Sequence, residues 1–172
     1  MSTTATSTGS FPPALSDTVR EAFEAACPSI FKAKATYLGD STEPPSTAGI
    51  VAIISLVADP LWAFALVLPK AVAPALAKKF AGFDIPYDSR DMADAVGELA
   101  NVVAGDIVAR LDRRGVKARM SLPMVASGTD VRLLQPGDVE VKRHSFKLPD
   151  GVFWVEVVVA KPGTTPFRMP GT

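Results

Sequence analysis

The sequence predicts an α+β domain in which long helices pack against a mostly antiparallel β-sheet, and three observations support this class. A long amphipathic helical pattern occupies residues 88–115. Apolar runs rich in β-branched and aromatic residues, which are typical of strands, lie on both sides of it. The last two runs are joined by Pro149-Asp150-Gly151, a turn sequence that favours a hairpin between antiparallel strands.

The composition is that of a globular protein with one domain. The 172 residues can bury one sizeable core, and 48% of them are hydrophobic. We expect the domain to span residues 14–161, between a disordered N-terminal tail at 1–13 and an irregular C-terminal tail at 162–172, since both tails are rich in small residues and proline. The 18 basic side chains balance the 18 acidic ones, so we expect no binding to nucleic acid or membranes.

The single cysteine and the single histidine restrict the possible chemistry. Cys27 excludes an internal disulfide and fits a reducing compartment, so we expect a cytoplasmic protein. It lies on the apolar side of a helical pattern, which favours a core position over a nucleophile. His144 is the only histidine, which makes a His-rich metal site or a Ser-His-Asp triad improbable. Because it lies among basic residues, we predict that it faces solvent.

Residues 49–69 form an almost wholly apolar segment with the length of a membrane span. Its middle is Asp59-Pro60, however. A charged side chain at a bilayer centre is costly, and proline breaks a helix. We therefore predict two buried strands joined by a turn at this dipeptide.

Several shorter elements are indicated around this hairpin. A helix is predicted at 16–26, closed off by Pro28, and a weak alternation suggests a strand at 31–38. A second helix is expected at 70–80, ending at Gly82. The remaining strands are expected at 118–125, 139–147 and 152–160.

The long helix has clear start and stop signals. Asp88 or Ser89 can cap its N-terminus, and Gly115 follows a last turn rich in arginine. These limits give a helix of about 26 residues, or about 39 Å. On a helical wheel one arc forms the core face, with Met92, Val96, Leu99, Val103 and Ile107.

The opposite arc of this helix carries Asp94, Glu98, Asn101 and Gly105. A carboxylate and an amide one turn apart therefore point in the same direction. Gly97 and Gly105, one turn before and one turn after Asn101, leave the surface around the amide bare, although glycine weakens a helix. The glycines either let a large partner approach the amide or permit close packing of the helix on the sheet.

The spacing D94-x3-E98-x2-N101-x21-P123 resembles the signature of the CheC/CheX/FliY family of chemotaxis phosphatases. In that family Asp or Ser, Glu, Asn and Pro occur at these four positions. The resemblance covers residues 49–128, whereas the loop at 131–139 and both tails lie outside it. It implies a CheC-like fold.

The resemblance also implies an activity, namely hydrolysis of the aspartyl phosphate of a CheY-like response-regulator receiver domain. Asn101 would orient the attacking water and Glu98 would pair with a lysine of the receiver. Asp94 would contact the partner or stabilise the positive end of the helix dipole. Pro123 would shape the entry of the strand, and Gly97 and Gly105 would provide clearance for the partner.

The chain is expected to need no cofactor of its own, because the receiver supplies Mg²⁺. The sequence holds one copy of the signature, which favours the single-site CheX-like branch and a homodimer. The long apolar strands expected at 49–57 and 152–159 are compatible with sheet pairing between protomers.

Two alternatives of other classes stay open. The chain is either a non-catalytic receiver-binding adaptor, like the flagellar-switch components that share the fold, or an interaction domain in which Glu98 and Asn101 are ordinary surface residues. Other enzyme classes are disfavoured, since the sequence shows no Gly-rich phosphate loop and no cluster of metal ligands.

Overall fold

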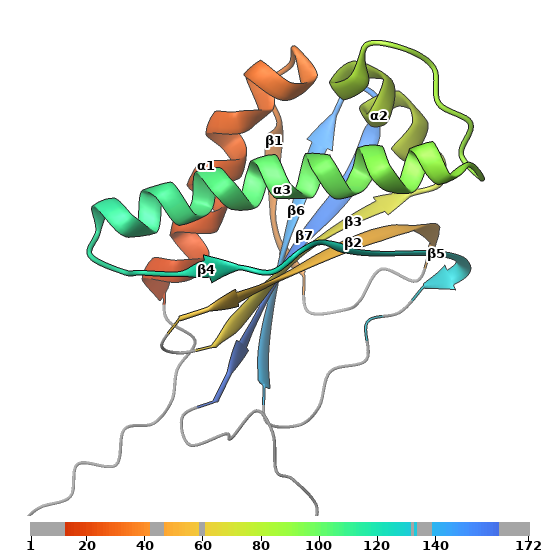
Figure 1. Cartoon of the computed structure of the whole chain (residues 1–172). Coiled ribbons are helices and arrows are strands. Elements are labelled where there is room, and N and C mark those ends of the chain that lie inside the picture. Colours follow the sequence, from red (N-terminus) through yellow and green to blue (C-terminus); the bar gives the residue numbers. More distant parts are fainter. Residues whose placement is uncertain (1–12, 42–46, 59–60, 132, 134–138, 162–172) are drawn as a thin grey trace, which may run out of the picture.

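The structure is a computed structural model that describes residues 13–41, 47–58, 61–131, 133 and 139–161 (Figure 1). The tails expected at 1–13 and 162–172 lie outside these residues, except for Pro13. Within the described residues the chain forms three helices and one seven-stranded sheet. The elements are α1 (Pro13–Phe31), β1 (Thr36–Ser41), β2 (Thr47–Val57), β3 (Trp62–Pro69), α2 (Ala73–Ala81), α3 (Arg90–Arg113), β4 (Arg119–Met120), β5 (Met124–Val131), β6 (Val139–Leu148) and β7 (Gly151–Ala160). The predicted α+β class is confirmed.

The sheet is antiparallel throughout, with the strand order β1-β6-β7-β3-β2 and with β4 and β5 along the outer edge of β2. Both predicted hairpins are present, one between β2 and β3 and one between β6 and β7. Strands β2 and β7 are therefore interior strands, and they do not offer the free edges that the sequence suggested for pairing between protomers. Among the described strands, the edges are β1 and the line of β4 and β5.

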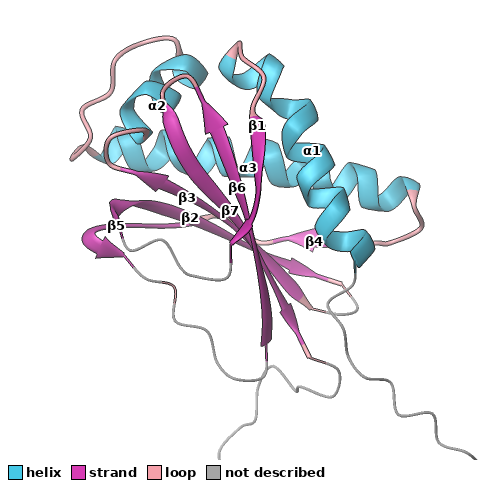
Figure 2. Cartoon of the chain, turned by 180° about the vertical axis from the view of Figure 1, so that it is seen from behind, coloured by secondary structure: helices cyan, strands magenta, loops and turns pink. Residues whose placement is uncertain are grey.

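The helices cover one face of the sheet (Figures 1 and 2), and the main core lies between the two layers. Helix α1 contributes Val19 and Phe23 to it, and α3 contributes Leu99 and Val103. Cys27 is fully buried in this core, as its helical position predicted. The opposite face of the sheet carries a smaller apolar cluster with Val51, Ala65 and Val67 at its centre.

The apolar segment at 49–69 is confirmed as two paired strands. Their register runs from Gly49–Pro69 to Leu56–Trp62, and Asp59 and Pro60, for which a turn was predicted, lie outside the described residues. Almost every residue of β3 is buried, because this strand lies in the middle of the sheet with side chains in both clusters. No helix within the described part of the chain is long and apolar enough to cross a membrane.

Helix α3 begins and ends close to the predicted limits. Ser89, not Asp88, is the N-cap, and its hydroxyl oxygen accepts a hydrogen bond from the Met92 amide. The helix has 24 residues and Gly115 follows it with φ of 82°, a backbone conformation that glycine adopts without strain. All five predicted core residues of this helix are buried.

Three local predictions were wrong. Helix α1 continues through Pro28 to Phe31, because the proline is exposed while Cys27, Ile30 and Phe31 around it are buried in the core. Packing therefore outweighs the hydrogen bond that proline cannot donate. The strand expected at 31–38 consequently starts later, as β1.

The third wrong prediction concerns the segment after α3. The single strand expected at 118–125 is divided into the short β4 and the longer β5. The division falls at Ser121-Leu122-Pro123, where proline has no N–H for the strand ladder. This break forms part of the candidate site.

Candidate functional site

A hollow of about 430 Å³ lies between α3 and the beginning of β5. Its lining residues are Ala93, Asp94, Gly97, Glu98 and Asn101 of α3, together with Pro123 and Val125. Five of the six residues singled out in the sequence thus surround one cavity, and Gly105 is the exception. Ala93 and Val125 were not singled out. Helical and strand periodicity would have found them, because Ala93 lies one turn before Gly97 and Val125 lies two residues after Pro123.

Ser121 holds the segment between β4 and β5 on the sheet. Its backbone amide donates to the Ser55 carbonyl at 2.9 Å, and its hydroxyl oxygen accepts from the Ser55 amide at 3.0 Å. These bonds replace part of the ladder that Pro123 interrupts. They place Pro123 beside Gly97 of α3, where it lines the hollow.

Gly97 is buried on the side of α3 that faces this segment. A Cβ atom built on it would lie 3.4 Å from Val125 Cγ2 and 3.5 Å from Pro123 Cγ, which is ordinary van der Waals contact. Gly97 therefore lets the start of β5 come close to the helix axis. Of the two roles that the sequence left open for the glycines, helix–sheet packing is the one that the surroundings of Gly97 favour.

Gly105 has different surroundings. A Cβ atom built there would meet nothing within 4 Å among the described residues. Gly105 lies one turn beyond Asn101 on the outer side of the helix, where a methyl group would project toward solvent. Clearance for a partner stays a prediction for Gly105, which has open space around it, and for Gly97, which lines the hollow.

Glu98 is exposed and Asn101 is half-buried. Within the described residues neither side chain has a hydrogen-bond or ion-pair partner. A polar head group without a protein partner is available for water or for another molecule. The carboxylate and the carboxamide line the same hollow one turn apart. This arrangement can position a polar ligand but contains no Ser, Thr, Cys or His among the lining residues that would attack it.

Asp94 also lines the hollow and is exposed. The acidic residue in the first turn of α3 is Asp91, whereas Asp94 is one turn further along. The effect of the helix dipole falls off within the first turn. Its position therefore favours contact with a partner over the dipole role.

His144 does not face solvent, so this prediction was wrong. The residue is buried with 1% of its surface exposed, and its two ring nitrogens lie 3.0 Å from Ser16 Oγ and 2.9 Å from Asp40 Oδ1. Because the Asp40 carboxylate only accepts, Nδ1 donates to it and Nε2 accepts from the Ser16 hydroxyl. The alternation of β6 contained the signal, since His144 shares its face with the buried Phe146 and Leu148.

This buried network has the connectivity of a Ser-His-Asp triad but not its accessibility. Ser16 has no exposed surface, so its hydroxyl cannot meet a substrate. Burial lowers the pKa of His144 despite the opposing effect of Asp40. Burial alone would raise the pKa of Asp40, but hydrogen bonds from Tyr37, Lys142 and His144 outweigh it and lower this pKa. The network joins α1, β1 and β6 and is structural.

The other reactive groups also lie apart from the hollow. Burial raises the pKa of the Cys27 thiol to about 12, so it stays protonated in the core. Within the described residues no group of three or more His, Cys, Asp and Glu side chains is arranged to hold a metal ion.

Solved structures with the same fold come from several bacteria. CheX of Desulfovibrio desulfuricans matches with a TM-score of 0.74 and 21% identity, over 85% of this chain and 99% of that one. CheX of Vibrio vulnificus matches with a TM-score of 0.76 and 15% identity, over 85% and 99% of the two chains. A complex of CheX, CheY, BeF₃ and Mg²⁺ from Borrelia burgdorferi matches with a TM-score of 0.68 and 19% identity, over 86% and 97%.

No curated protein matches the sequence. A family model described as chemotaxis phosphatase CheX matches residues 50–147, which include every residue of the hollow. The match continues past residue 128, where the resemblance was expected to end, and includes residues 131–139, which were expected to lie outside it. The chain therefore belongs to the CheX family of chemotaxis phosphatases, with the CheC-like fold.

Proposed function

We propose that the chain hydrolyses the aspartyl phosphate of a CheY-like response-regulator receiver domain. The observation that carries this proposal is the hollow in which Glu98 and Asn101 lie one turn apart, both without a partner among the described residues. Membership of the CheX family supplies the reaction class. The reaction is proposed for the cytoplasm, where the thiol of Cys27 would stay reduced.

The chemistry explains why positioning groups suffice. An aspartyl phosphate is already activated, so its hydrolysis needs a water aligned for in-line attack more than a new nucleophile. The carboxamide oxygen of Asn101 would accept a hydrogen bond from this water and hold its oxygen toward phosphorus. The bond from water oxygen to phosphorus then forms while the acyl oxygen–phosphorus bond breaks. The phosphoryl group leaves as inorganic phosphate, which keeps the protons of the water, and the receiver aspartate returns as a carboxylate. Because the amide carries no charge, it does not repel the phosphoryl oxygens.

Glu98 is proposed to pair with a lysine of the receiver and so fix the orientation of α3 over the phosphoryl group. Asp94, on the same side of the helix, would add a second acidic contact. Mg²⁺ would come with the receiver. The Borrelia burgdorferi complex, which contains CheX, CheY, BeF₃ and Mg²⁺, supports this partner and this ion.

The single signature and the open edge of the sheet support a homodimer. Strand β5 is an edge strand of eight residues, most of them exposed. Three exposed apolar side chains lie at or near this edge of the sheet: Met124 (69%) begins β5, Leu122 (87%) lies between β4 and β5, and Val57 (60%) ends β2, opposite Arg119 of β4. Apolar side chains at a strand edge favour pairing with another chain. Light scattering on the full chain tests this proposal, and a monomer at all concentrations would contradict it.

The experiment that tests the phosphatase activity is release of phosphate from receiver domains charged with acetyl phosphate in Mg²⁺. The wild type is compared with Asn101→Ala, and folding is checked by thermal melting. We expect the wild type to accelerate release and the folded variant not to. If both proteins bind a receiver but neither accelerates release, the chain is an adaptor and the proposed activity is overturned.

A further inference from the structure

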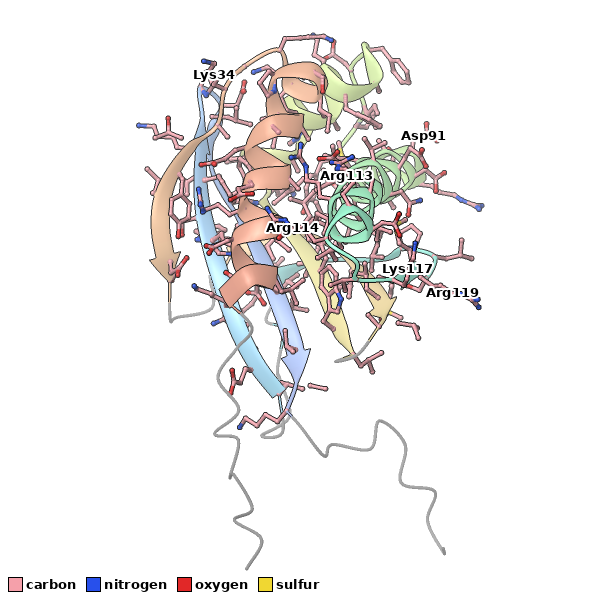
Figure 3. All side chains as sticks on the ribbon, turned by 90° about the vertical axis from the view of Figure 1, so that its left-hand side faces the viewer. Lys34, Asp91, Arg113, Arg114, Lys117 and Arg119 are labelled. Carbon is pink, nitrogen blue, oxygen red and sulfur yellow. The ribbon has the colours of Figure 1, made fainter. Side chains whose placement is uncertain are left out.

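The chain turns back after α3 and runs along the edge of the sheet as β4 and β5 (Figure 1). Figure 3 shows Lys117 and Arg119, at the start of this return, on the side of α3 away from α1. Between β4 and β5 the segment reaches Pro123, which lines the hollow. The conformation of this segment therefore determines where one wall of the hollow lies.

This segment contains one residue more than the part of β2 opposite it. Leu56 of β2 pairs with Met120, and Ile53 pairs with Met124. Between these two pairs β2 has two residues, 54 and 55, and the opposite segment has three, namely Ser121, Leu122 and Pro123. The extra residue forms a β-bulge, a feature that is frequent next to active sites and changes the direction of a side chain.

The hydroxyl group of Ser121 makes two hydrogen bonds within the bulge. It accepts from the Ser55 amide at 3.0 Å and donates to the Leu122 carbonyl oxygen at 2.8 Å. The Ser121 amide also donates to the Ser55 carbonyl oxygen at 2.9 Å. Because Ser121 is exposed, water can satisfy the same groups, so these bonds are not needed to avoid buried unpaired atoms. Their effect is to select one geometry of the bulge.

The Leu122 carbonyl belongs to the peptide unit that contains the nitrogen of Pro123. Since a peptide unit is planar, the hydrogen bond from Ser121 fixes the orientation of this plane. The proline ring restricts its own φ to about −65°. With both set, the direction of the Pro123 ring is determined. The ring lies against α3, where a Cβ atom built on Gly97 would be 3.5 Å from Pro123 Cγ.

The contact with α3 falls beside the two polar side chains of the hollow. Gly97 precedes Glu98 and lies one turn before Asn101. Pro123 and both polar residues line the same hollow. A movement of the proline ring away from Gly97 would therefore widen the hollow next to the carboxamide that is proposed to hold the water.

We propose that Ser121 is a positioning residue for the phosphatase reaction. Its hydroxyl group holds Pro123 against α3 and so keeps the hollow narrow enough to confine the attacking water beside Asn101. This inference rests on the proposed function, since it concerns the same site. Ser121 does not line the hollow and acts through Pro123. Loss of the hydroxyl group should lower kcat more than it raises KM, because Glu98 stays on the helix to bind the receiver.

The test compares phosphate release by Ser121→Ala, which loses both bonds of the hydroxyl group, and Ser121→Thr, which keeps a hydroxyl group. We expect kcat to fall by roughly 10-fold in Ser121→Ala, less than the roughly 100-fold that a misplacement of about 1 Å can cost. Ser121→Thr should stay near the wild type. Ser127→Ala is the matched control, because Ser127 is an exposed residue of β5 that lies outside the hollow and has no side-chain partner among the described residues.

A second measurement tests the route through the proline. The double variant Ser121→Ala/Pro123→Ala is compared with both single variants. If the hydroxyl group acts by holding the proline ring, removal of the ring leaves it nothing to position. The loss of kcat in the double variant should then equal the loss in Pro123→Ala alone. Losses that multiply would show that Ser121 acts independently of Pro123 and would overturn the inference.

The outcomes separate this inference from the proposed function. If the wild type accelerates release from no receiver, both are overturned. If the wild type is active and Ser121→Ala has the same kcat, only the inference is overturned, and a lower melting temperature of that variant would show that the hydroxyl group merely stabilises the fold. A folded Ser121→Thr with the kcat of Ser121→Ala, or an equal loss in Ser127→Ala, would also overturn the inference.

Discussion

Two groups of polar side chains in this chain have opposite surroundings. Glu98 and Asn101 line an open hollow and have no partner among the described residues. Ser16, Asp40 and His144 form a connected network between α1 and the sheet, in which the serine and the histidine are buried and bonded. Both groups consist of residues common in catalytic sites, so residue type alone does not distinguish them.

The difference lies in what each group contributes to the folded state. A polar group without exposure must be hydrogen-bonded, because leaving it unpaired costs free energy. The His144 network therefore stabilises the fold. Unpaired groups at the surface contribute little to stability and are free to contact another molecule. Substitutions in the network should change stability, and substitutions in the hollow should change activity.

The largest expected effect is on activity, at Asn101. Asn101→Asp keeps the shape of the side chain but places a carboxylate beside Glu98 and against the phosphoryl oxygens. We expect phosphate release to fall by roughly 10²–10³-fold, as when one preorganised polar group of a catalytic site is lost. The free energy of unfolding should stay within about 0.5 kcal/mol of the wild type, as for other surface substitutions. Single-turnover release from a charged receiver and a denaturant melt measure the two quantities.

This prediction would be contradicted by an Asp variant that retains the wild-type rate. In that case a carboxylate orients water as well as a carboxamide does, and charge at position 101 has no influence. A variant that loses both stability and rate would instead place Asn101 among the structural polar groups.

The residues of the hollow were easier to predict from the sequence than the His144 network. Asp94, Glu98 and Asn101 lie on one helix, so periodicity alone showed that they share a side. The resemblance to the phosphatase family then added Pro123, which no local pattern connects to the helix. The fold class followed from similar local signals, such as the interrupted apolar run at 49–69.

What the sequence did not show depends on contacts between distant segments. The alternation of β6 indicated that His144 is buried, but its partners could not be predicted, because Ser16 and Asp40 lie more than 100 residues away in the chain. Helix α1 passes through Pro28 because tertiary packing outweighs a local breaking signal. The unlike surroundings of Gly97 and Gly105 depend on where β5 crosses the helix, which no spacing within the helix reveals.

The next largest effect is expected on stability, at His144. His144→Leu keeps much of the volume but leaves the Ser16 hydroxyl without its partner in the core. The free energy of unfolding should fall by about 1–3 kcal/mol, the cost of a buried unpaired polar group. Phosphate release at a temperature where the variant is folded should be unchanged, because the network does not reach the hollow. A variant that is stable but inactive would contradict this separation.

The same histidine gives the wild type a pH dependence. Since burial lowers its pKa below the ordinary value of 6.5, the unfolded chain takes up a proton that the folded chain resists. Stability should therefore be complete above pH 6.5 and fall as the pH drops through the folded pKa. Denaturant melts between pH 7.5 and pH 5 should show this loss in the wild type and a flatter profile in His144→Leu. Equal profiles would show that His144 does not titrate differently in the two states.

The smallest effects are expected at two glycines of α3. Gly97 lines the hollow, and Gly105 lies on the outer side of the same helix. Replacing either glycine with alanine should stabilise α3 by up to about 1 kcal/mol, the helix propensity difference. At Gly97 the methyl group would contact Pro123 and Val125 at ordinary distances, so receiver binding should change little. At Gly105 it would project outward beside Asn101, so the KM for the charged receiver should rise several-fold while kcat is kept.

Steady-state kinetics on Gly97→Ala and Gly105→Ala therefore test where the receiver lies. A rise in KM confined to Gly105→Ala means that the partner covers the outer side of α3 beyond Asn101, in the direction of Arg113. A rise confined to Gly97→Ala means that the receiver depends on the depth of the hollow itself, and that the contact does not extend along the helix. Because both variants gain the same helix propensity, a difference between them reports contact with the partner and not helix stability.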